Sequence, residues 1–155
     1  SVLFREIPRF CPEHLAYISC ANTAQTKRFR TGLRHLLHEG VVQPFILGGS
    51  SGAQLLGAVG PLQFDVLQYR LNAEYGAQAR LEPAQWQIVR WVKDAGGKAL
   101  QEDMLMSDAR LAQDAAGRQV ILFVKEWDCA YFLKQHPEFS LSTFPPGTIL
   151  GTVKP

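Results

Sequence analysis

Two kinds of apolar spacing alternate along this chain, one typical of strands and one typical of helices. In the first half, strand-like segments at 14–20, 41–47, 54–59 and 77–81 are interleaved with two helix-like segments, one ending near Glu39 and one running from Pro61 to Tyr75. Gly40 and Gly76 follow these helical segments at the position where glycine commonly ends a helix. The pattern predicts the order β-α-β-β-α-β, with a hairpin loop over the glycine-rich residues 48–52.

The second half repeats this order more weakly. Strands are predicted at 87–93, 107–113, 119–125 and 139–143, turns at 94–97 and 114–117, a short helix at 98–103 and a longer helix at 126–136. We therefore predict an α+β fold made of two ferredoxin-like split β-α-β units in series. Residues 1–83 would form the first unit, 84–143 a second, smaller unit, and 144–155 a loosely attached tail.

The predicted helix at 61–75 is apolar on two opposite sides. One side carries Leu62, Val66, Tyr69 and Ala73, and the other carries Phe64, Leu67, Leu71 and Tyr75. A helix that is apolar on both sides is usually buried on both sides. We therefore expect the two units to share this helix at their interface and to form one compact body.

Composition narrows the class of protein. Of the 155 residues 46% are apolar and 19% are charged, which favours a folded core over disorder. The net charge of +2 is too small to indicate nucleic-acid binding by itself. Three cysteines without a C-x-x-C pair, no long apolar run and no signal peptide favour a cytoplasmic protein without a membrane anchor. The chain begins without methionine, and we interpret it as part of a longer protein with domains upstream.

The usual signatures of catalysis and cofactor binding are absent from the sequence. The glycines at 48–60 lack the lysine and hydroxyl residue of a phosphate-binding loop. His35 and His38 are spaced to share a metal ion, but no further ligands lie near them in the sequence. Cys129 and the three tryptophans are interpreted as core residues. We predict no catalytic, cofactor-binding or metal-binding residue in this chain.

One surface feature suggests a binding function. Lys27, Arg30, Arg34 and His38 follow helical spacing along one stripe of the first helix, and Arg28 lies to its side. Such a stripe can contact a phosphate backbone, because each bound cation releases a condensed counterion. From spacing alone, an ordinary solvated helix face is the favoured interpretation of this stripe. The candidate RNA-contact residues are Lys27, Arg28, Arg30 and Arg34.

Three segments resemble a known family. They are residues 57–66, the later Leu71-x-x-Glu74-Tyr75 and the helix end at residues 39–43. Together they resemble the third domain of translational GTPases of the elongation factor G class. Elongation factors usually have glycine-glutamate-leucine-histidine after the strand, whereas this chain has Gly60-Pro61-Leu62-Gln63, which is similar to the release factor 3 branch of that class. Residues 84–93 and 133–139 extend the resemblance into the second half.

The resemblance implies a role in translation termination. Factors of this branch are GTPases that bind the ribosome and promote dissociation of class I release factors. Their nucleotide site, for GTP or GDP with magnesium, belongs to an N-terminal domain followed by a β-barrel, and neither matches this chain. The resemblance therefore implies a non-catalytic piece that contacts the ribosome and the upstream GTPase and β-barrel domains. No catalytic residue is carried over.

Two alternatives stay open at this stage. The chain could be the equivalent domain of another translational GTPase, such as an elongation factor or a ribosome protection protein. It could also be a free-standing ferredoxin-like domain that senses a ligand or acts on a small molecule, since this fold serves many functions. Apolar pockets with paired acid and base residues would favour the second alternative.

Overall fold

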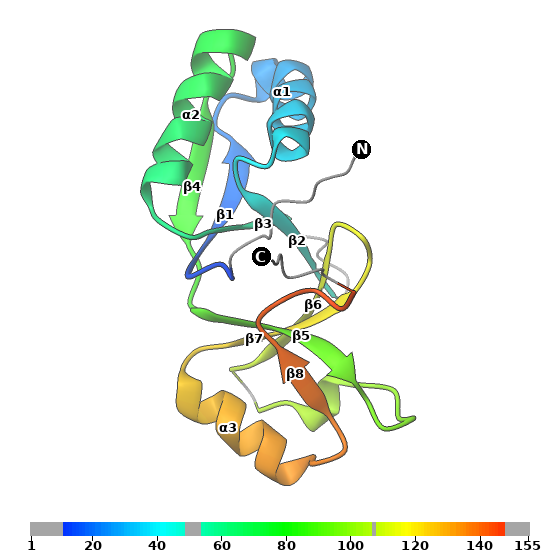
Figure 1. Cartoon of the computed structure of the whole chain (residues 1–155). Coiled ribbons are helices and arrows are strands. Elements are labelled where there is room, and N and C mark those ends of the chain that lie inside the picture. The colour runs from blue at the N-terminus through cyan, green and yellow to red at the C-terminus, as the bar shows by residue number, and fades with distance from the viewer. Residues whose placement is uncertain (1–10, 49–53, 107, 148–155) are drawn as a thin grey trace, which may run out of the picture.

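The computed structural model describes residues 11–48, 54–106 and 108–147 (Figure 1). The first unit contains β1 (His14–Cys20), α1 (Thr26–Glu39), β2 (Gln43–Leu47), β3 (Gln54–Ala58), α2 (Leu62–Tyr75) and β4 (Ala79–Pro83). The second contains β5 (Ile88–Asp94), β6 (Arg110–Asp114), β7 (Gln119–Phe123), α3 (Glu126–Gln135) and β8 (Ser140–Ser142). Single 3-10 turns, η2 (Thr23–Gln25) and η3 (Glu102–Met104), precede α1 and β6.

All eight strands belong to one antiparallel sheet, in the order β4-β1-β3-β2-β6-β7-β5-β8. The first four positions show the strand order of a split β-α-β unit, and the last four repeat it in reverse. The units join through β2 and β6, where Phe45 lies opposite Asp114 and Leu47 opposite Ala112. The predicted α+β class and ferredoxin-like units are confirmed. The domain boundaries at 83 and 143 stay predictions.

Glycines end the first two helices as the sequence predicts. Gly40 and Gly76 have φ of 83° and 66°, the left-handed conformation that glycine adopts without strain. Pro61 stands immediately before α2, where its missing N–H costs no helical hydrogen bond. The predicted helix bounds at Glu39, Tyr75 and 126–136 agree with the structure to within a residue.

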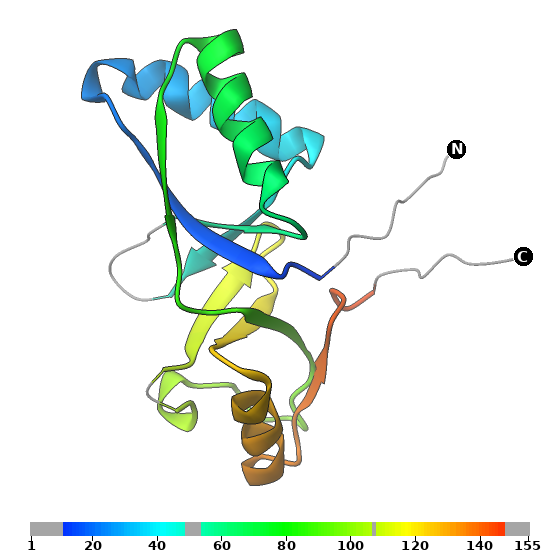
Figure 2. The same ribbon diagram turned by 90° about the vertical axis from the view of Figure 1, so that its left-hand side faces the viewer.

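Three hydrophobic cores form because β1, β3 and β7 bury residues on both of their faces. One core lies under α1 and α2 and includes Leu33, Leu56 and Leu71, and another lies under α3 and includes Phe123 and Phe132. The third consists of the sheet faces turned away from the helices and holds residues of both units. Its buried members are Leu15, Phe45, Leu47, Leu55, Trp86, Val89, Trp91, Ala112, Val120 and Leu122. Helices therefore occupy the two ends of the molecule, with the strands between them (Figure 2).

The predicted role of α2 at the interface between the units is wrong. Leu67 and Leu71 are fully buried, but Leu62 and Tyr69 on the opposite side are 70% and 72% exposed. The units meet instead through strand pairing and the central core, because strands such as Val120–Phe123 are apolar on both faces. The outer side of α2 faces solvent beside the sheet edge formed by β4.

The first helix predicted for the second unit is absent. Residues 98–101 are irregular and only η3 follows, because a segment this short gains too few helical hydrogen bonds to offset helix nucleation. The predicted turns at 94–97 and 114–117 are confirmed, with positive φ at Gly96, Gly97 and Gly117. Most of the predicted 48–52 loop and residues 148–155 of the predicted tail lie outside the described residues. At the start of that tail Pro145 is buried, and Arg118 Nη1 donates to Pro146 O at 3.3 Å.

Candidate functional site

Helix α1 carries the candidate contact surface, and local hydrogen bonds fix its start. Asn22 Oδ1 accepts from the Ala24 N–H at 3.0 Å, and Thr26 Oγ1 donates to Thr23 O at 2.7 Å. The first bond satisfies an N–H of the 3-10 turn η2 that leads into α1, and the second ties the first residue of α1 back to that turn.

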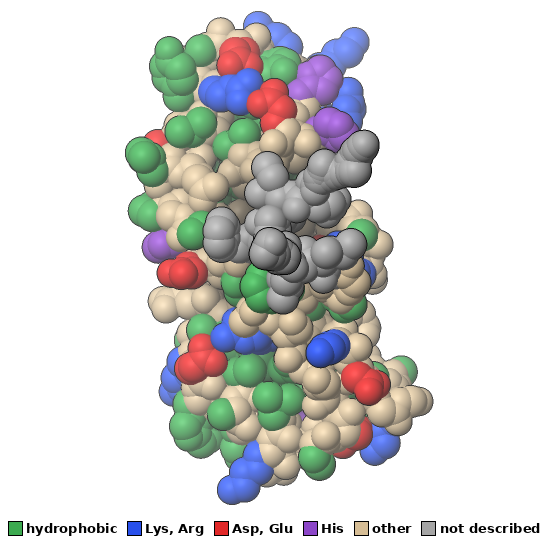
Figure 3. Space-filling view, in the orientation of Figure 1, with side chains coloured by type: hydrophobic (Ala, Val, Ile, Leu, Met, Phe, Trp, Pro, Cys, Tyr) green, Lys and Arg blue, Asp and Glu red, His purple; other side chains and the backbone are tan. Residues whose placement is uncertain are grey.

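Burial of one side of α1 turns its cations outward. The buried side of α1 carries Phe29, Leu33 and Leu36, so the stripe on its opposite side lies in solvent. Lys27, Arg28, Arg30 and Arg34 are all exposed, and none forms an ion pair with a described residue. Lys, Arg and His side chains gather at this end of the molecule (Figure 3). We call Lys27, Arg30 and Arg34 the basic face.

Arg28 is separated from the basic face. Its Nη1 lies 3.0 Å from the place that a Cβ on Gly76 would take, at the C-terminal end of α2. A guanidinium there is stabilised by the negative end of the helix dipole. Arg28 therefore contributes to the packing of the two helices as well as to the exposed charge.

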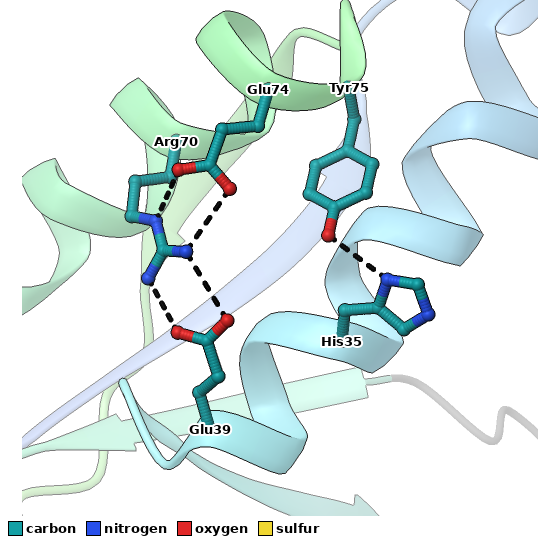
Figure 4. A network of polar contacts seen from close by, with 5 residues as sticks. All are labelled: His35, Glu39, Arg70, Glu74 and Tyr75. Atoms are coloured by element: carbon teal, nitrogen blue, oxygen red, sulfur yellow. Dashed lines mark hydrogen bonds and ion pairs between the residues drawn. The ribbon is translucent and has the colours of Figure 1, made fainter.

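A polar network ties α1 to α2 (Figure 4). Arg70 donates to both oxygens of Glu39, at 2.7 and 3.2 Å, and to both oxygens of Glu74, at 2.7 and 3.1 Å. The hydrogen bonds from Arg70 lower the pKa of both carboxyls, and the two carboxylates raise the pKa of Arg70. Tyr75 Oη and His35 Nδ1 are 3.0 Å apart. The network holds the basic face in a fixed orientation relative to α2.

Histidines on α1 do not assemble a metal site. Within the described residues no group of three or more His, Cys, Asp or Glu side chains is placed to hold a metal ion. His35 and His38 line an open hollow of about 480 Å³ together with Arg34, Glu39 and Tyr75. Glu39 in this hollow is already bound to Arg70.

A second hollow of about 400 Å³ lies where the two units meet. Its wall is largely apolar and comes from β1, β4, the start of α2 and the linker before β5. Glu13, His14 and Gln87 are its polar members, and Phe64, Leu81 and Trp86 are among its apolar ones.

No described helix has the length and apolar character to cross a bilayer.

Sequence reasoning missed the role of Gln63 in the segment that carries the family resemblance. Its Oε1 accepts from the Val59 and Gly60 N–H groups at 2.7 and 3.0 Å, and its Nε2 donates to Val41 O at 3.2 Å. One side chain thus closes the turn from β3 into α2 and ties it to the end of α1. The sequence signal that could have predicted this role is a glutamine two residues after a proline that starts a helix.

Comparison with known proteins gives one consistent result. The family described as "Class II release factor RF3, C-terminal domain" matches residues 4–133. Peptide chain release factor 3 of Gloeothece citriformis is 37% identical over 145 residues, covering 92% of this chain and 26% of that protein. Peptide chain release factor 3 of a Cyanothece species is 38% identical over 144 residues, with the same coverage. The chain spans about a quarter of these relatives and belongs to the family of class II release factor RF3 C-terminal domains.

Proposed function

We propose that this chain is the ribosome-contacting, non-catalytic part of a peptide chain release factor 3, and that the basic face of α1 binds ribosomal RNA. The family match and relatives named peptide chain release factor 3, such as those of Gloeothece citriformis and Nostoc punctiforme, favour this function over an elongation factor or a ribosome protection protein. In this proposal the factor acts in the cytoplasm and promotes dissociation of class I release factors.

The observation that carries the proposal is the uncompensated charge of the basic face. Lys27, Arg30 and Arg34 share one exposed stripe, and none has an acidic partner among the described residues. Glu39, the nearest acidic residue along the helix, is bound by Arg70. Cations in this state bind phosphate groups with a gain of counterion entropy, which is the main source of sequence-independent affinity for RNA.

GTP hydrolysis belongs, in this proposal, to the part of the full-length factor that this chain does not include. The chain would move as a rigid body against the GTPase and β-barrel domains when the nucleotide changes. The network of Arg70, Glu39 and Glu74 supports this, since it links the helix that carries the basic face to the neighbouring helix.

Charge reversal of the basic face tests the proposal. The variant K27E/R30E/R34E is placed in the full-length factor, and its binding to ribosomes is measured by co-sedimentation over a series of salt concentrations. We expect weaker binding and a less steep dependence of log K on log salt, since each lost phosphate contact lowers the slope by roughly 0.7–0.9.

The matched control compares two variants with the same change in net charge, R30E/R34E on the basic face and R80E/K93E elsewhere, where Arg80 and Lys93 are exposed and form no ion pair with a described residue. Equal loss in both variants would show that only overall charge matters. Unchanged ribosome binding of K27E/R30E/R34E at low salt would exclude the basic face as a contact. Circular dichroism spectra of all these variants check that the fold is retained.

A further inference from the structure

Helix α3 exposes a stacked pair of aromatic rings. Trp127 and Tyr131 are one helical turn apart, with ring centroids separated by 5.2 Å and ring planes inclined by 12°. The two side chains are 60% and 39% exposed. The interpretation of all three tryptophans as core residues is correct for Trp86 and Trp91, which are 2% and 1% exposed, and wrong for Trp127.

The buried side of α3 explains why this pair faces solvent. Cys129 and Phe132 fill the core beneath the helix, and Phe132 packs against Phe123 and Phe139. Trp127 and Tyr131 lie on the other side of the helix, where each ring covers one face of its neighbour and both side chains remain partly exposed. The pair is therefore ordered before any partner binds, and a flat partner loses little side-chain entropy on joining the stack.

Exposed charges of both signs lie near the pair, and the two lysines among them have no ion-pair partner among the described residues. Glu126 lies 3.2 Å from Arg90 Nη2 and is bound to it, and Asp128 is buried. Lys125 and Lys134 are exposed and form no ion pair with a described residue. In Figure 3, hydrophobic side chains gather over α3 with Lys or Arg side chains beside them. Partly exposed aromatic rings next to unpaired cations match the chemistry of single-stranded nucleic acid, in which bases stack and phosphates bind lysine.

We infer that Trp127 and Tyr131 form a stacking platform for an unpaired RNA base, with Lys125 and Lys134 binding the adjoining phosphates. Helix α3 lies at the opposite end of the molecule from α1 (Figures 1 and 2). The platform is thus a second RNA contact, different in kind from the basic face and independent of it. It gives the chain two separated points of attachment to one large RNA.

Tryptophan fluorescence provides a direct test on this chain. Of the three tryptophans, Trp127 is the exposed one. An oligoadenylate RNA that stacks on Trp127 should therefore quench its fluorescence, which is the part of the emission that added acrylamide also quenches. Binding of the labelled RNA at low salt is then compared by anisotropy for the wild type and W127A/Y131A. We expect about a tenfold or greater loss of affinity in the variant. Trp127→Phe should restore much of the affinity, because it keeps an aromatic face.

The control variant is Tyr69→Ala, which removes a still more exposed aromatic ring from α2. A length-matched abasic ribose-phosphate strand keeps the charges and lacks the bases, and it should neither quench Trp127 nor distinguish W127A/Y131A from the wild type. Equal affinity of W127A/Y131A and the wild type for oligoadenylate would overturn the inference. So would quenching of Trp127 by an uncharged aromatic peptide but not by RNA, which would identify a protein partner.

Failure of this inference is distinguishable from failure of the proposed function. The variant K27E/R30E/R34E is included in the same titration, and it should still show quenching of Trp127. If K27E/R30E/R34E abolishes all binding while W127A/Y131A has no effect, the basic face alone binds RNA and the stacking platform is excluded.

Discussion

Trp91 Nε1 donates a hydrogen bond to Asp114 Oδ2 at 2.9 Å, and both side chains are buried. The bond connects β5 to the end of β6, next to the pairing of Phe45 and Asp114 through which the two units join. The same carboxylate accepts from the Ala116 and Arg118 N–H groups, both at 2.9 Å, and from Arg118 Nε at 2.8 Å. One buried anion thus organises the β6–β7 turn and fixes the indole in the central core.

Removing the Asp114 carboxylate should strongly destabilise the chain. Asp114→Ala leaves the Trp91 indole N–H and two backbone N–H groups without an acceptor, and we expect the free energy of unfolding to fall by about 3 kcal/mol. Trp91→Phe keeps an aromatic ring against Phe45 but removes one donor and leaves a small cavity in the central core, so its cost should be nearer about 2 kcal/mol. Urea unfolding measures both, and a smaller loss for Asp114→Ala than for Trp91→Phe would contradict this account.

Stability should depend on pH through the same residue. Burial raises the pKa of Asp114, but hydrogen bonds from Trp91 and Arg118 and the charge of Arg118 outweigh it, so the pKa is lowered overall. A carboxyl whose folded pKa is depressed stabilises the fold above its unfolded pKa, which is about 3.9, and this stability is lost as pH falls through the folded pKa. Asp114→Asn should therefore flatten the decline in stability below about pH 4, measured by urea unfolding at a series of pH values. If stability declines as steeply in Asp114→Asn as in the wild type, other carboxyls are responsible for the decline.

Local features were predictable from the sequence, and contacts between distant segments were not. Gly40 and Gly76 mark the helix ends, and the helical spacing of Lys27, Arg30 and Arg34 places them on one exposed stripe. The spacing in α2 shows two apolar sides but carries no signal for which side is covered. The pairing of β2 with β6 is equally invisible, because strand periodicity specifies faces and not neighbours. The hydrogen bond from Trp91 to Asp114 and the arrangement of Arg70 with Glu39 depend on such distant contacts.

Gly32 should not tolerate a side chain, because α1 and α2 cross closely there. A Cβ at this position would lie 2.6 Å from Tyr75 Cγ and 3.0 Å from Leu71 Cδ2. Gly32→Ala should lower the free energy of unfolding by about 1–2 kcal/mol, since the overpacking exceeds the gain in helix propensity. The control is Gly60→Ala, whose Cβ would meet nothing within 4 Å and whose effect should be below about 0.5 kcal/mol. Equal stability of the two variants would show that α1 can shift without cost.

Gln63 should stabilise the turn between β3 and α2. Gln63→Ala removes the acceptor of the Val59 and Gly60 N–H groups and should cost about 1–2 kcal/mol, as loss of a helix cap does. Gln63→Glu keeps that acceptor and adds a negative charge near the start of the helix, which the dipole favours, while it loses the donor to Val41 O. We expect Gln63→Glu to be the more stable of the two variants at neutral pH in thermal unfolding. The reverse order would show that the bond to Val41 matters more than the cap.

Truncation of a side chain should destabilise the chain strongly on one side of α2 and hardly at all on the other. Leu71 is fully buried, so Leu71→Ala leaves a cavity and should lower the free energy of unfolding by about 2–5 kcal/mol. Tyr69 is 72% exposed on the other side, and Tyr69→Ala should change it by less than about 0.5 kcal/mol. Both variants replace a large side chain of the same helix by alanine. The difference between their free energies of unfolding therefore reports mainly how deeply each side chain is buried. Urea unfolding of this chain measures the difference. A loss above about 1 kcal/mol for Tyr69→Ala would mean that the outer side of α2 is covered in solution.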